Sequence, residues 1–294
     1  MESERRRRSY LVGARISRAR MEQDSPEDAA ALDAVGDDDI IVVSGAYDKV
    51  EWVLEALGLP HHIIKPDDVA SFPLAPDQLL IVNCPGRLGP DGIEAASAFV
   101  DGGGSLFTTD WALRHLIEPG FPGTIRFNRR PTRNDIVRIS VGRHDNPFLR
   151  GVLDPEDDPL WWLEGSSYPM DILDPGKVEV LITSGELETN YGADPVAVVF
   201  RHGLGEVFHT VSHYYLQRAE TRTRRHSRSG AFYAAEKGIG LSSEDLALAA
   251  DLQLTEVEAA ASSTRWLSNV IAAKRRAAEQ SPFRGDDTDP PPAS

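Results

Sequence analysis

The side chains with the clearest chemical potential in this chain are Cys84, Asp110 and His213. A thiol can act as a nucleophile, and a carboxyl group paired with an imidazole can transfer protons when the two lie within hydrogen-bond reach. Each residue follows a short apolar segment that has the length of a buried strand. Ligands of open α/β sheets bind beyond the carboxyl ends of the strands, so the sequence predicts that these side chains face one crevice.

Each of the three residues also has a purely structural interpretation. Free cysteine is among the most buried residue types, which favours an inert Cys84 over a nucleophile. Asp110 can cap a helix that starts at Trp111 by accepting hydrogen bonds from its free amides. For Asp110, helix capping is slightly favoured over catalysis. For His213, a place in the functional site and a structural hydrogen bond to a backbone carbonyl are equally favoured.

The sequence predicts no metal site and no cofactor. His209 and His213 are four residues apart, but their β-branched and aromatic neighbours indicate a strand. On a strand that spacing separates the two rings by about 13 Å, too far to share a metal ion. The glycines at 102–104 precede a strand instead of opening a helix, which is the wrong geometry for a phosphate loop.

The elements that position these residues form a β-α-β unit. Leu79–Val82 and residues 105–108 read as strands, and residues 90–101 read as the helix that connects them. Two more strands and a helix are predicted upstream, at 39–45, 61–65 and 47–57. This order predicts an α/β fold, namely a flavodoxin-like, doubly wound parallel sheet. A hairpin at 195–201 and 206–213 and C-terminal helices are added to it.

The rest of the chain is predicted from charge and periodicity. Residues 119–131 read as irregular, residues 135–141 as one strand, and residues 255–279 as a helix that follows a capping box. A narrow apolar stripe is expected on that helix, formed by Val257, Ala261, Trp266, Val270 and Ile271. The predicted divisions are a disordered charged leader (1–36), an α/β domain (37–216), a basic loop (217–230), a helical segment (231–280) and a disordered tail (281–294).

Composition narrows the class of protein. The net charge of −15 argues against general nucleic-acid binding, which depends on cationic contacts to phosphate. The single cysteine excludes an internal disulfide and fits a reducing compartment. No apolar run approaches the roughly 18 residues of a membrane span, so a cytoplasmic location without membrane contact is expected. The expected partner is another protein, bound through the basic loop and the C-terminal helices, or a small polar ligand.

Four motifs together resemble the class I glutamine amidotransferase-like superfamily, and within it the trehalose-utilisation (ThuA-like) branch. They are the strand exit Asn83-Cys84-Pro85-Gly86, the helix-to-strand passage at 99–107, the segment at 145–151 and the strand at 203–213. The resemblance covers roughly residues 39 to 216. It implies the same α/β fold and a crevice at the carboxyl ends of the strands.

The chain departs from the pattern of those amidotransferases at two places. The resemblance places their nucleophilic cysteine on the turn after the fourth strand, where this chain has residues 108–111 and no cysteine. It also implies a carboxylate two residues after the catalytic histidine, whereas His213 is followed by Tyr214 and Tyr215. Glutaminase chemistry needs a thiolate, a base and an orienting group, so the sequence argues against that activity.

Eight further residues are predicted to line a ligand site. Most of them lie at strand exits, and Glu164 and Tyr168 approach from the substrate side after the Trp161-Trp162 pair. That pair is more typical of a core edge or a partner surface than of a sugar platform. The predicted ligand-binding residues are Ser44, Tyr47, Asn83, Gly86, Thr109, Trp111, Glu164 and Tyr168.

Three functions remain open from the sequence. The first is a non-catalytic or diverged amidotransferase-like domain that acts as a ligand-binding or protein-interaction module. The second is a ThuA-like enzyme acting on a small polar metabolite such as a sugar, with His213 and Asp110 in the site. The third is a thiol hydrolase that uses Cys84. The balance of these arguments leans away from an enzyme.

Overall fold

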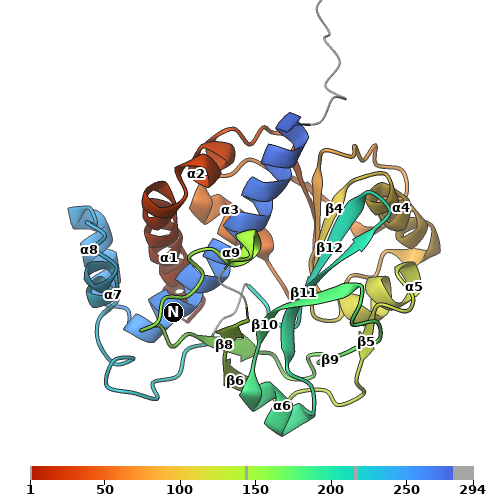
Figure 1. Cartoon of the computed structure of the whole chain (residues 1–294). Coiled ribbons are helices and arrows are strands. Elements are labelled where there is room, and N and C mark those ends of the chain that lie inside the picture. The colour runs from red at the N-terminus through yellow and green to blue at the C-terminus, as the bar shows by residue number, and fades with distance from the viewer. Residues whose placement is uncertain (1, 143–144, 215–217, 281–294) are drawn as a thin grey trace, which may run out of the picture.

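The centre of the computed structural model is an eight-stranded sheet. The model describes residues 2–142, 145–214 and 218–280. Figure 1 shows helices packed around this sheet. In spatial order the strands are β2 (His62–Ile64), β1 (Ile40–Val43), β3 (Leu79–Val82), β4 (Ser105–Thr109), β12 (Gly205–Thr210), β11 (Pro195–His202), β10 (Val178–Thr183) and β7 (Ser140–Val141).

Five neighbouring strands of the sheet, from β2 to β12, are parallel. The four apolar residues of β1 and of β3 and all five residues of β4 are buried, as expected for parallel strands covered by helices, whereas the edge strand β2 is partly exposed. The register pairs Val82 with Thr108 and Thr109 with Thr210, so β3, β4 and β12 end side by side. The order β2-β1-β3-β4 followed by a fifth parallel strand is flavodoxin-like and confirms the predicted fold class.

The other strands are antiparallel. β11 and β12 form the predicted hairpin, and β10 and β7 extend the sheet beyond it. The single strand predicted at 135–141 is wrong, because β6 pairs with another segment while β7 joins the main sheet. The region 119–131, predicted to be irregular, contains β5. The small sheets pair β5 (Ile125–Phe127) with β9 (Met170–Ile172) and β6 (Asp135–Arg138) with β8 (Leu160–Leu163).

Short helices connect the strands of the sheet. Two of them match predicted helices: α3 buries Val50, Val53 and Leu54, and α4 buries Ala96, Phe99 and Val100. In Figure 1, α4 and α5 lie on the opposite side of β4 and β12 from α9. The connecting elements are α3 (Val50–Leu57), η1 (Pro66–Asp68), α4 (Gly89–Asp101), η2 (Leu113–Ile117), α5 (Glu118–Gly120), η3 (Pro147–Leu149) and α6 (Gly185–Tyr191).

The prediction of a disordered leader is wrong for residues 2–33, which form α1 (Glu2–Asp24) and α2 (Pro26–Asp33). α1 packs against α9 (Leu254–Gln280), α3 and α8 (Ser243–Ala250). It buries residues on several sides, so its sequence shows no single apolar stripe. The buried apolar side chains include Tyr10, Val12, Ile16 and Met21.

Several basic residues of α1 pair with acidic groups of the same chain, although some of them, such as Arg7, are exposed. The Arg5 guanidinium donates to Glu256 on α9 at 2.6 Å, and Arg20 lies 2.9 Å from Asp154. These ion pairs explain how a helix with low mean hydropathy is anchored to the body of the protein. A charge run in the sequence therefore does not by itself indicate a solvated tail.

The C-terminal helices confirm the predicted helical segment. Ser242 caps α8 by accepting from the Asp245 amide at 3.1 Å, and α7 (Gly230–Glu236) precedes it. The predicted narrow stripe on α9 is wrong, because the helix is buried on nearly all sides from 254 to 272. α1 and α2 cover the face of α9 that points away from the sheet. The predicted tail at 281–294 lies outside the described residues.

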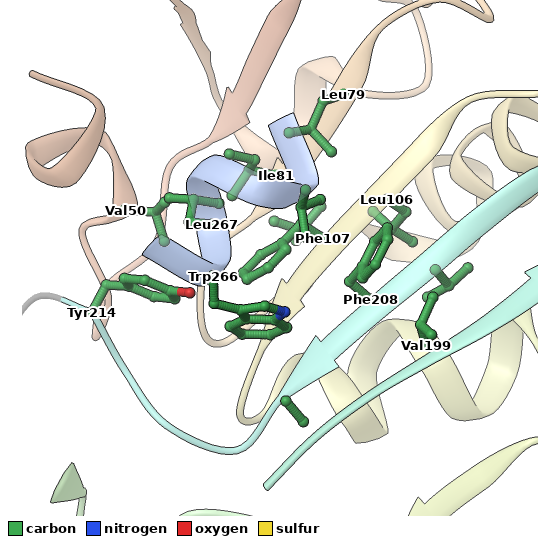
Figure 2. Close-up of a cluster of buried hydrophobic side chains, with 14 of the residues drawn as sticks. Val50, Leu79, Ile81, Leu106, Phe107, Val199, Phe208, Tyr214, Trp266 and Leu267 are labelled. Carbon is green, nitrogen blue, oxygen red and sulfur yellow. The ribbon is translucent and has the colours of Figure 1, made fainter. Parts of the chain in front are cut away.

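Trp266 of α9 fills the space between that helix and the sheet (Figure 2). Its ring is fully buried and lies 5.0 Å from the ring of Phe107 on β4. Trp161 of β8 packs on its other side at 6.2 Å and donates its indole N–H to Ser262. Such aromatic contacts contribute about 0.5–1.5 kcal/mol each beyond the burial of apolar area. Trp161 is therefore a core residue and not a sugar platform.

The basic loop carries arginines that are largely engaged within the chain. Arg222 lies 2.8 Å from Glu186, and Arg225 lies 2.7 Å from Glu258 on α9. Arg228 stacks over the ring of Phe232. Gln217, the first residue of the predicted loop, lies outside the described residues. The partner surface predicted here thus has fewer unpaired charges than the sequence implies, and protein binding through it stays a prediction.

Within the described ranges, no helix combines the length and the apolar character that a membrane span requires.

Candidate functional site

The exits of β3, β4 and β12 bring the three chemically capable side chains together. Asp110 follows β4 directly, Cys84 lies two residues beyond the end of β3 at Val82, and His213 lies three residues beyond the end of β12 at Thr210. Gly86 allows the exit of β3 to approach the exit of β4, because it has φ +69° and a Cβ there would lie 2.5 Å from Ala112. The predicted convergence of these strand ends on one crevice is therefore observed.

Asp110 occupies a sharp turn after β4 and has a positive φ of 42°. Non-glycine residues adopt this conformation rarely, and it often marks functional sites. Its carboxylate accepts hydrogen bonds from the Tyr168 amide at 2.7 Å and the Ser167 hydroxyl at 3.0 Å. The predicted capping of a following helix is wrong, because the carboxylate points toward the 166–168 turn.

His213 lies between two carboxylates. Its Nε2 is 3.1 Å from Asp110 Oδ2, and its Nδ1 is 3.0 Å from Glu164 Oε2. The imidazole is buried, whereas the Glu164 side chain is 32% exposed and reaches it from the loop after β8. Trp162 packs 6.3 Å from the ring and donates its indole N–H to Asn134. The two carboxylates fix the orientation of the ring.

The thiol of Cys84 completes this group, because ligand atoms of Cys84, Asp110 and His213 lie within 4.8 Å of one another. Its backbone amide donates to Thr109 Oγ1 at 2.9 Å, which fixes the exit of β3 against β4. Burial raises the pKa of the Cys84 thiol to about 11, despite the opposing effect of His213. In the apo protein the thiol is therefore protonated at neutral pH, unlike a nucleophilic cysteine.

Protons are held tightly in this group. Burial alone lowers the pKa of His213, but its hydrogen bonds to Asp110, Cys84 and Glu164 outweigh that effect and raise the pKa well above its usual value. Burial also raises the pKa of Asp110, and the bond to His213 only partly offsets it. Both shifts favour the protonated forms of these two side chains.

A second buried carboxylate, Asp48, supports the site from behind. Its Oδ1 accepts from the Lys49 amide at 2.8 Å and from the Tyr214 amide at 3.1 Å. Burial raises the pKa of Asp48, while the positive charge of His213 and a hydrogen bond from Thr109 lower it. Because it holds the residue after His213, Asp48 fixes the segment that carries the imidazole.

A pocket of about 160 Å³ opens at this group. Tyr47 and Trp111 form its aromatic wall, with ring centroids 5.3 Å apart and edge-to-face geometry. Trp111 is held by a hydrogen bond from its indole N–H to the Ser166 carbonyl and by stacking on Tyr168 at 5.5 Å. The lining residues are Tyr47, Cys84, Asp110, Trp111, Glu164, Gly165, Ser166 and His213.

The remaining predicted ligand-binding residues lie behind the pocket wall. Asn83 is buried and bonds to Glu51 and the Val50 amide, which joins the exit of β3 to the start of α3. Thr109 and Tyr168 hold Cys84 and Asp110 through the hydrogen bonds described above. Ser44 donates its amide to Ile64 and borders the neighbouring strand. These residues and Gly86 support the site without lining the pocket.

Sequence reasoning missed Asp48, Gly165 and Ser166. Asp48 lies in the first turn of the helix predicted at 47–57, where an acidic residue normally indicates only a favourable interaction with the helix N-terminus. Gly165 and Ser166 belong to a tight turn, and Ser166 has a φ of 73°. The dipeptide indicates a turn, but no local pattern reveals that this turn lies over β4.

The site also has the composition of a metal site. One ligand atom from each of Cys84, Asp110 and His213 can be chosen so that all three lie within 4.8 Å of one another. In the described part of the chain this is the one such group of His, Cys, Asp or Glu. Larger hollows of about 330 and 610 Å³ lie elsewhere, but neither of them contains this group.

No protein-family model matches the sequence, and no curated protein matches it. Similar solved structures include a glutamine amidotransferase from Thermotoga maritima, with 8% identity and a TM-score of 0.44, covering 82% of this chain and 98% of that one. A putative ThuA-like protein from Bacteroides uniformis has 11% identity and a TM-score of 0.41, covering 61% and 83%.

An exo-β-1,4-mannosidase from Opitutaceae bacterium strain TAV5 has 11% identity and a TM-score of 0.42. The match covers 60% of this chain and 31% of the mannosidase, so this chain spans less than a third of that enzyme. Likenesses at these values are too distant to carry an argument about activity.

Proposed function

We propose that this chain is a diverged amidotransferase-like domain whose pocket binds a small polar molecule, and that it has no glutaminase activity. The observation that carries the proposal is the convergence of Cys84, Asp110, Glu164 and His213 on one pocket at the strand exits. Concave sites with a few converging polar groups and aromatic walls are typical of small-molecule binding.

The turn after β4 supports the absence of glutaminase activity. The resemblance places a nucleophilic cysteine on that turn, and the residue at its strained position is Asp110. The only thiol comes from the neighbouring strand exit. Both ring nitrogens of His213 lie within 3.1 Å of carboxylate oxygens, and burial raises the pKa of the Cys84 thiol to about 11, whereas a cysteine nucleophile needs a lowered pKa.

The size of the pocket limits the ligand. Its volume of about 160 Å³ is well below the roughly 300–1,000 Å³ of pockets for drug-sized molecules. The lining offers carboxylates, an imidazole and a thiol beside two aromatic rings. We therefore expect a compact compound with several hydrogen-bonding groups, no larger than a monosaccharide or an amino acid.

Tryptophan fluorescence of the full chain tests the proposal, because Trp111 lies in the pocket wall. A panel of monosaccharides, amino acids, hydroxy acids and small amines is titrated into the protein. At least one compound is expected to change the fluorescence saturably and to raise the melting temperature. Replacing Trp111 with Phe should remove the optical signal, while the matched variant Trp52→Phe, outside the pocket, should retain it.

Two outcomes would contradict the proposal. One is a panel in which no compound gives either signal. The other is a compound whose fluorescence change survives in Trp111→Phe and disappears in Trp52→Phe, since the ligand would then bind away from the pocket.

A second candidate function is a ThuA-like enzyme that acts on the bound metabolite. The observation in its favour is the strained backbone of Asp110 beside His213, an arrangement that is common in active sites. If the domain turns over its ligand, Asp110→Asn and His213→Gln should abolish product formation. If it only binds, no product should form with the wild-type chain.

A further inference from the structure

We propose that Cys84, Asp110 and His213 bind a zinc ion at the base of the pocket. The proposal deepens the proposed function, since it concerns the same pocket, but metal binding can be measured without any organic ligand. The sequence predicts that these three residues face one crevice, but it predicts no metal site, because His209 and His213 are too far apart on a strand to share an ion. In the folded sheet, ligand atoms of Cys84, Asp110 and His213 lie within 4.8 Å of one another.

The distances fit a tetrahedral centre. Zinc binds sulfur at about 2.3 Å and nitrogen or oxygen at about 2.0–2.2 Å, which places pairs of ligand atoms roughly 3.2–3.7 Å apart. Nε2 of His213 and Oδ2 of Asp110 are 3.1 Å apart, and the atoms of all three residues lie within 4.8 Å of one another. Small side-chain adjustments suffice to admit the ion.

The surroundings orient the ligands as metal sites require. His213 Nδ1 lies 3.0 Å from Glu164, so a carboxylate accepts the second ring proton while Nε2 faces the metal. Asp110 is fixed from behind, because its Oδ1 accepts from the Tyr168 amide and its Oδ2 from Ser167. A carboxylate-histidine pair of this kind is the usual outer support of a zinc-bound imidazole.

The donor set selects the metal. A thiolate and an imidazole favour zinc over magnesium and calcium, which prefer ligand sets made entirely of oxygen. Three protein ligands leave a fourth position, and here the pocket of about 160 Å³ adjoins all three. That arrangement is typical of zinc sites that act on or hold a ligand, whereas structural zinc sites use four protein ligands. Water or a donor atom of the small polar ligand takes the fourth position.

Cobalt(II) titration of the chelator-treated full chain tests the site, since Co²⁺ replaces Zn²⁺ and is coloured. A thiolate ligand gives a sulfur-to-metal charge-transfer band, and tetrahedral geometry gives intense visible bands. We expect both at one equivalent of Co²⁺, and their loss when Zn²⁺ is added. Cys84→Ser, a nearly isosteric change, should remove the charge-transfer band.

Glu164→Gln provides a second variant whose folding is not in doubt, because that side chain is partly exposed. It removes the outer carboxylate and should weaken metal affinity roughly 10- to 100-fold while the tetrahedral bands remain. The matched control replaces both His61 and His62 with Ala. His62 pairs with Asp38 at the surface and is an alternative place for an adventitious ion. This control should bind Co²⁺ as the wild type does.

Two results would overturn the metal site: the absence of a thiolate band at stoichiometric Co²⁺, or tetrahedral visible bands that keep their full intensity in Cys84→Ser. The ligand panel is repeated with and without chelator so that the two proposals can fail separately. Ligand binding in chelator without a cobalt band would overturn the metal site and leave the binding pocket standing. A cobalt band without any bound compound would support the metal site and count against the proposed function.

Discussion

Two clusters of buried charged side chains in this protein differ in what they adjoin. The pocket cluster consists of Cys84, Asp110, Glu164 and His213, and it opens onto about 160 Å³ of space. The helix-anchoring cluster lies between α1, α7, α9 and the loop at 154–158, beside a hollow of only about 10 Å³. Its members are Arg20, Asp154, Asp157, Arg225, Lys237 and Glu258.

The pairing in the two clusters also differs. In the helix-anchoring cluster each cation meets at least one carboxylate from another element, as in the contacts of Lys237 with Asp154 at 2.7 Å and Asp157 at 2.6 Å. In the pocket cluster two carboxylates share one imidazole beside a thiol. Charges that pair across elements beside so small a hollow indicate a structural role. An unbalanced group at a cavity indicates a binding role.

The largest expected effect comes from removing α1. A chain that lacks residues 1–24 loses the buried side chains of Tyr10, Val12, Ile16 and Met21 and the Arg20 pair. At roughly 1.5–3 kcal/mol for each buried side chain, the loss is at least about 6 kcal/mol. Domains are stabilised by only about 5–15 kcal/mol, so the truncated chain should not fold cooperatively.

Circular dichroism and urea unfolding of the truncated and full chains measure this effect. The variant Arg7→Ser is the control, since Arg7 is exposed and the rest of α1 remains in place. A truncated chain with an unchanged urea midpoint would show that the helix-anchoring cluster is dispensable, and the comparison between the clusters would fail.

The next largest effect is expected for Arg225→Met. Arg225 contacts Asp157, Glu236 and Glu258, and its removal takes the cation away from the fully buried carboxylate of Glu258, whereas Asp157 keeps Lys237. Breaking a buried pair from one side costs about 3–5 kcal/mol of unfolding free energy. Arg228→Met in the same loop is the matched control, because Arg228 is exposed and its stacking over Phe232 should contribute about 1 kcal/mol or less. Equal losses in the two variants would contradict the structural role assigned to the cluster.

The sequence predicts the features that have a local signal and misses those that depend on contacts between distant segments. The parallel strands were predictable because short apolar runs ending in small or polar residues are a local signal. Cys84, Asp110 and His213 were predicted to share a crevice because parallel strand ends meet at one edge. The partners that define their chemistry are not local. The bond from His213 to Glu164 joins segments from opposite sides of the pocket, and no spacing rule encodes it.

The segment predicted to be a disordered leader, residues 1–36, shows an error of another kind, since helices form where the sequence predicts none. α1 has Arg5, Arg20 and other charges on its surface and buried residues on several faces, so it resembles a solvated segment by composition. Its order depends on ion pairs and packing supplied by α9, which lies at the far end of the chain. Long-range contacts of this kind override local propensity.

The buried His209 of β12 allows a test through the pH dependence of stability. His209 is fully buried, contacts Thr108 Oγ1 at 2.8 Å, and burial lowers its pKa to about 3. Because the folded pKa lies below the unfolded value, the unfolded state binds the proton first as pH falls. Its contribution to stability is therefore present above about pH 6.5 and declines as pH falls toward 3.

Unfolding free energies at pH 6.5 and 5 measure this contribution. The wild type should lose about 1–2 kcal/mol more than His209→Asn across that interval. The difference between the two slopes isolates His209 from the carboxylates that titrate in both proteins. Equal slopes would show that the buried imidazole of His209 is not kept neutral by its surroundings.

The smallest effect on stability is expected for Glu164→Gln, although it alters the pocket cluster directly. The Glu164 side chain is 32% exposed, and exposed or half-exposed pairs contribute only about 0–1 kcal/mol. Asp157→Asn is the matched change in the helix-anchoring cluster, where the carboxylate is fully buried between Arg225 and Lys237. It should lose more than about 1.5 kcal/mol, because bonds to charged groups contribute about 1.5–3 kcal/mol.

Urea unfolding of the two variants side by side separates the roles of the clusters. Glu164→Gln should fall within about 0.5 kcal/mol of the wild type, as most substitutions outside the core do. A larger loss at Glu164 than at Asp157 would mean that the pocket cluster holds the fold together. If Glu164 can be replaced without loss of stability, its carboxylate serves the binding role of the pocket and not the stability of the fold.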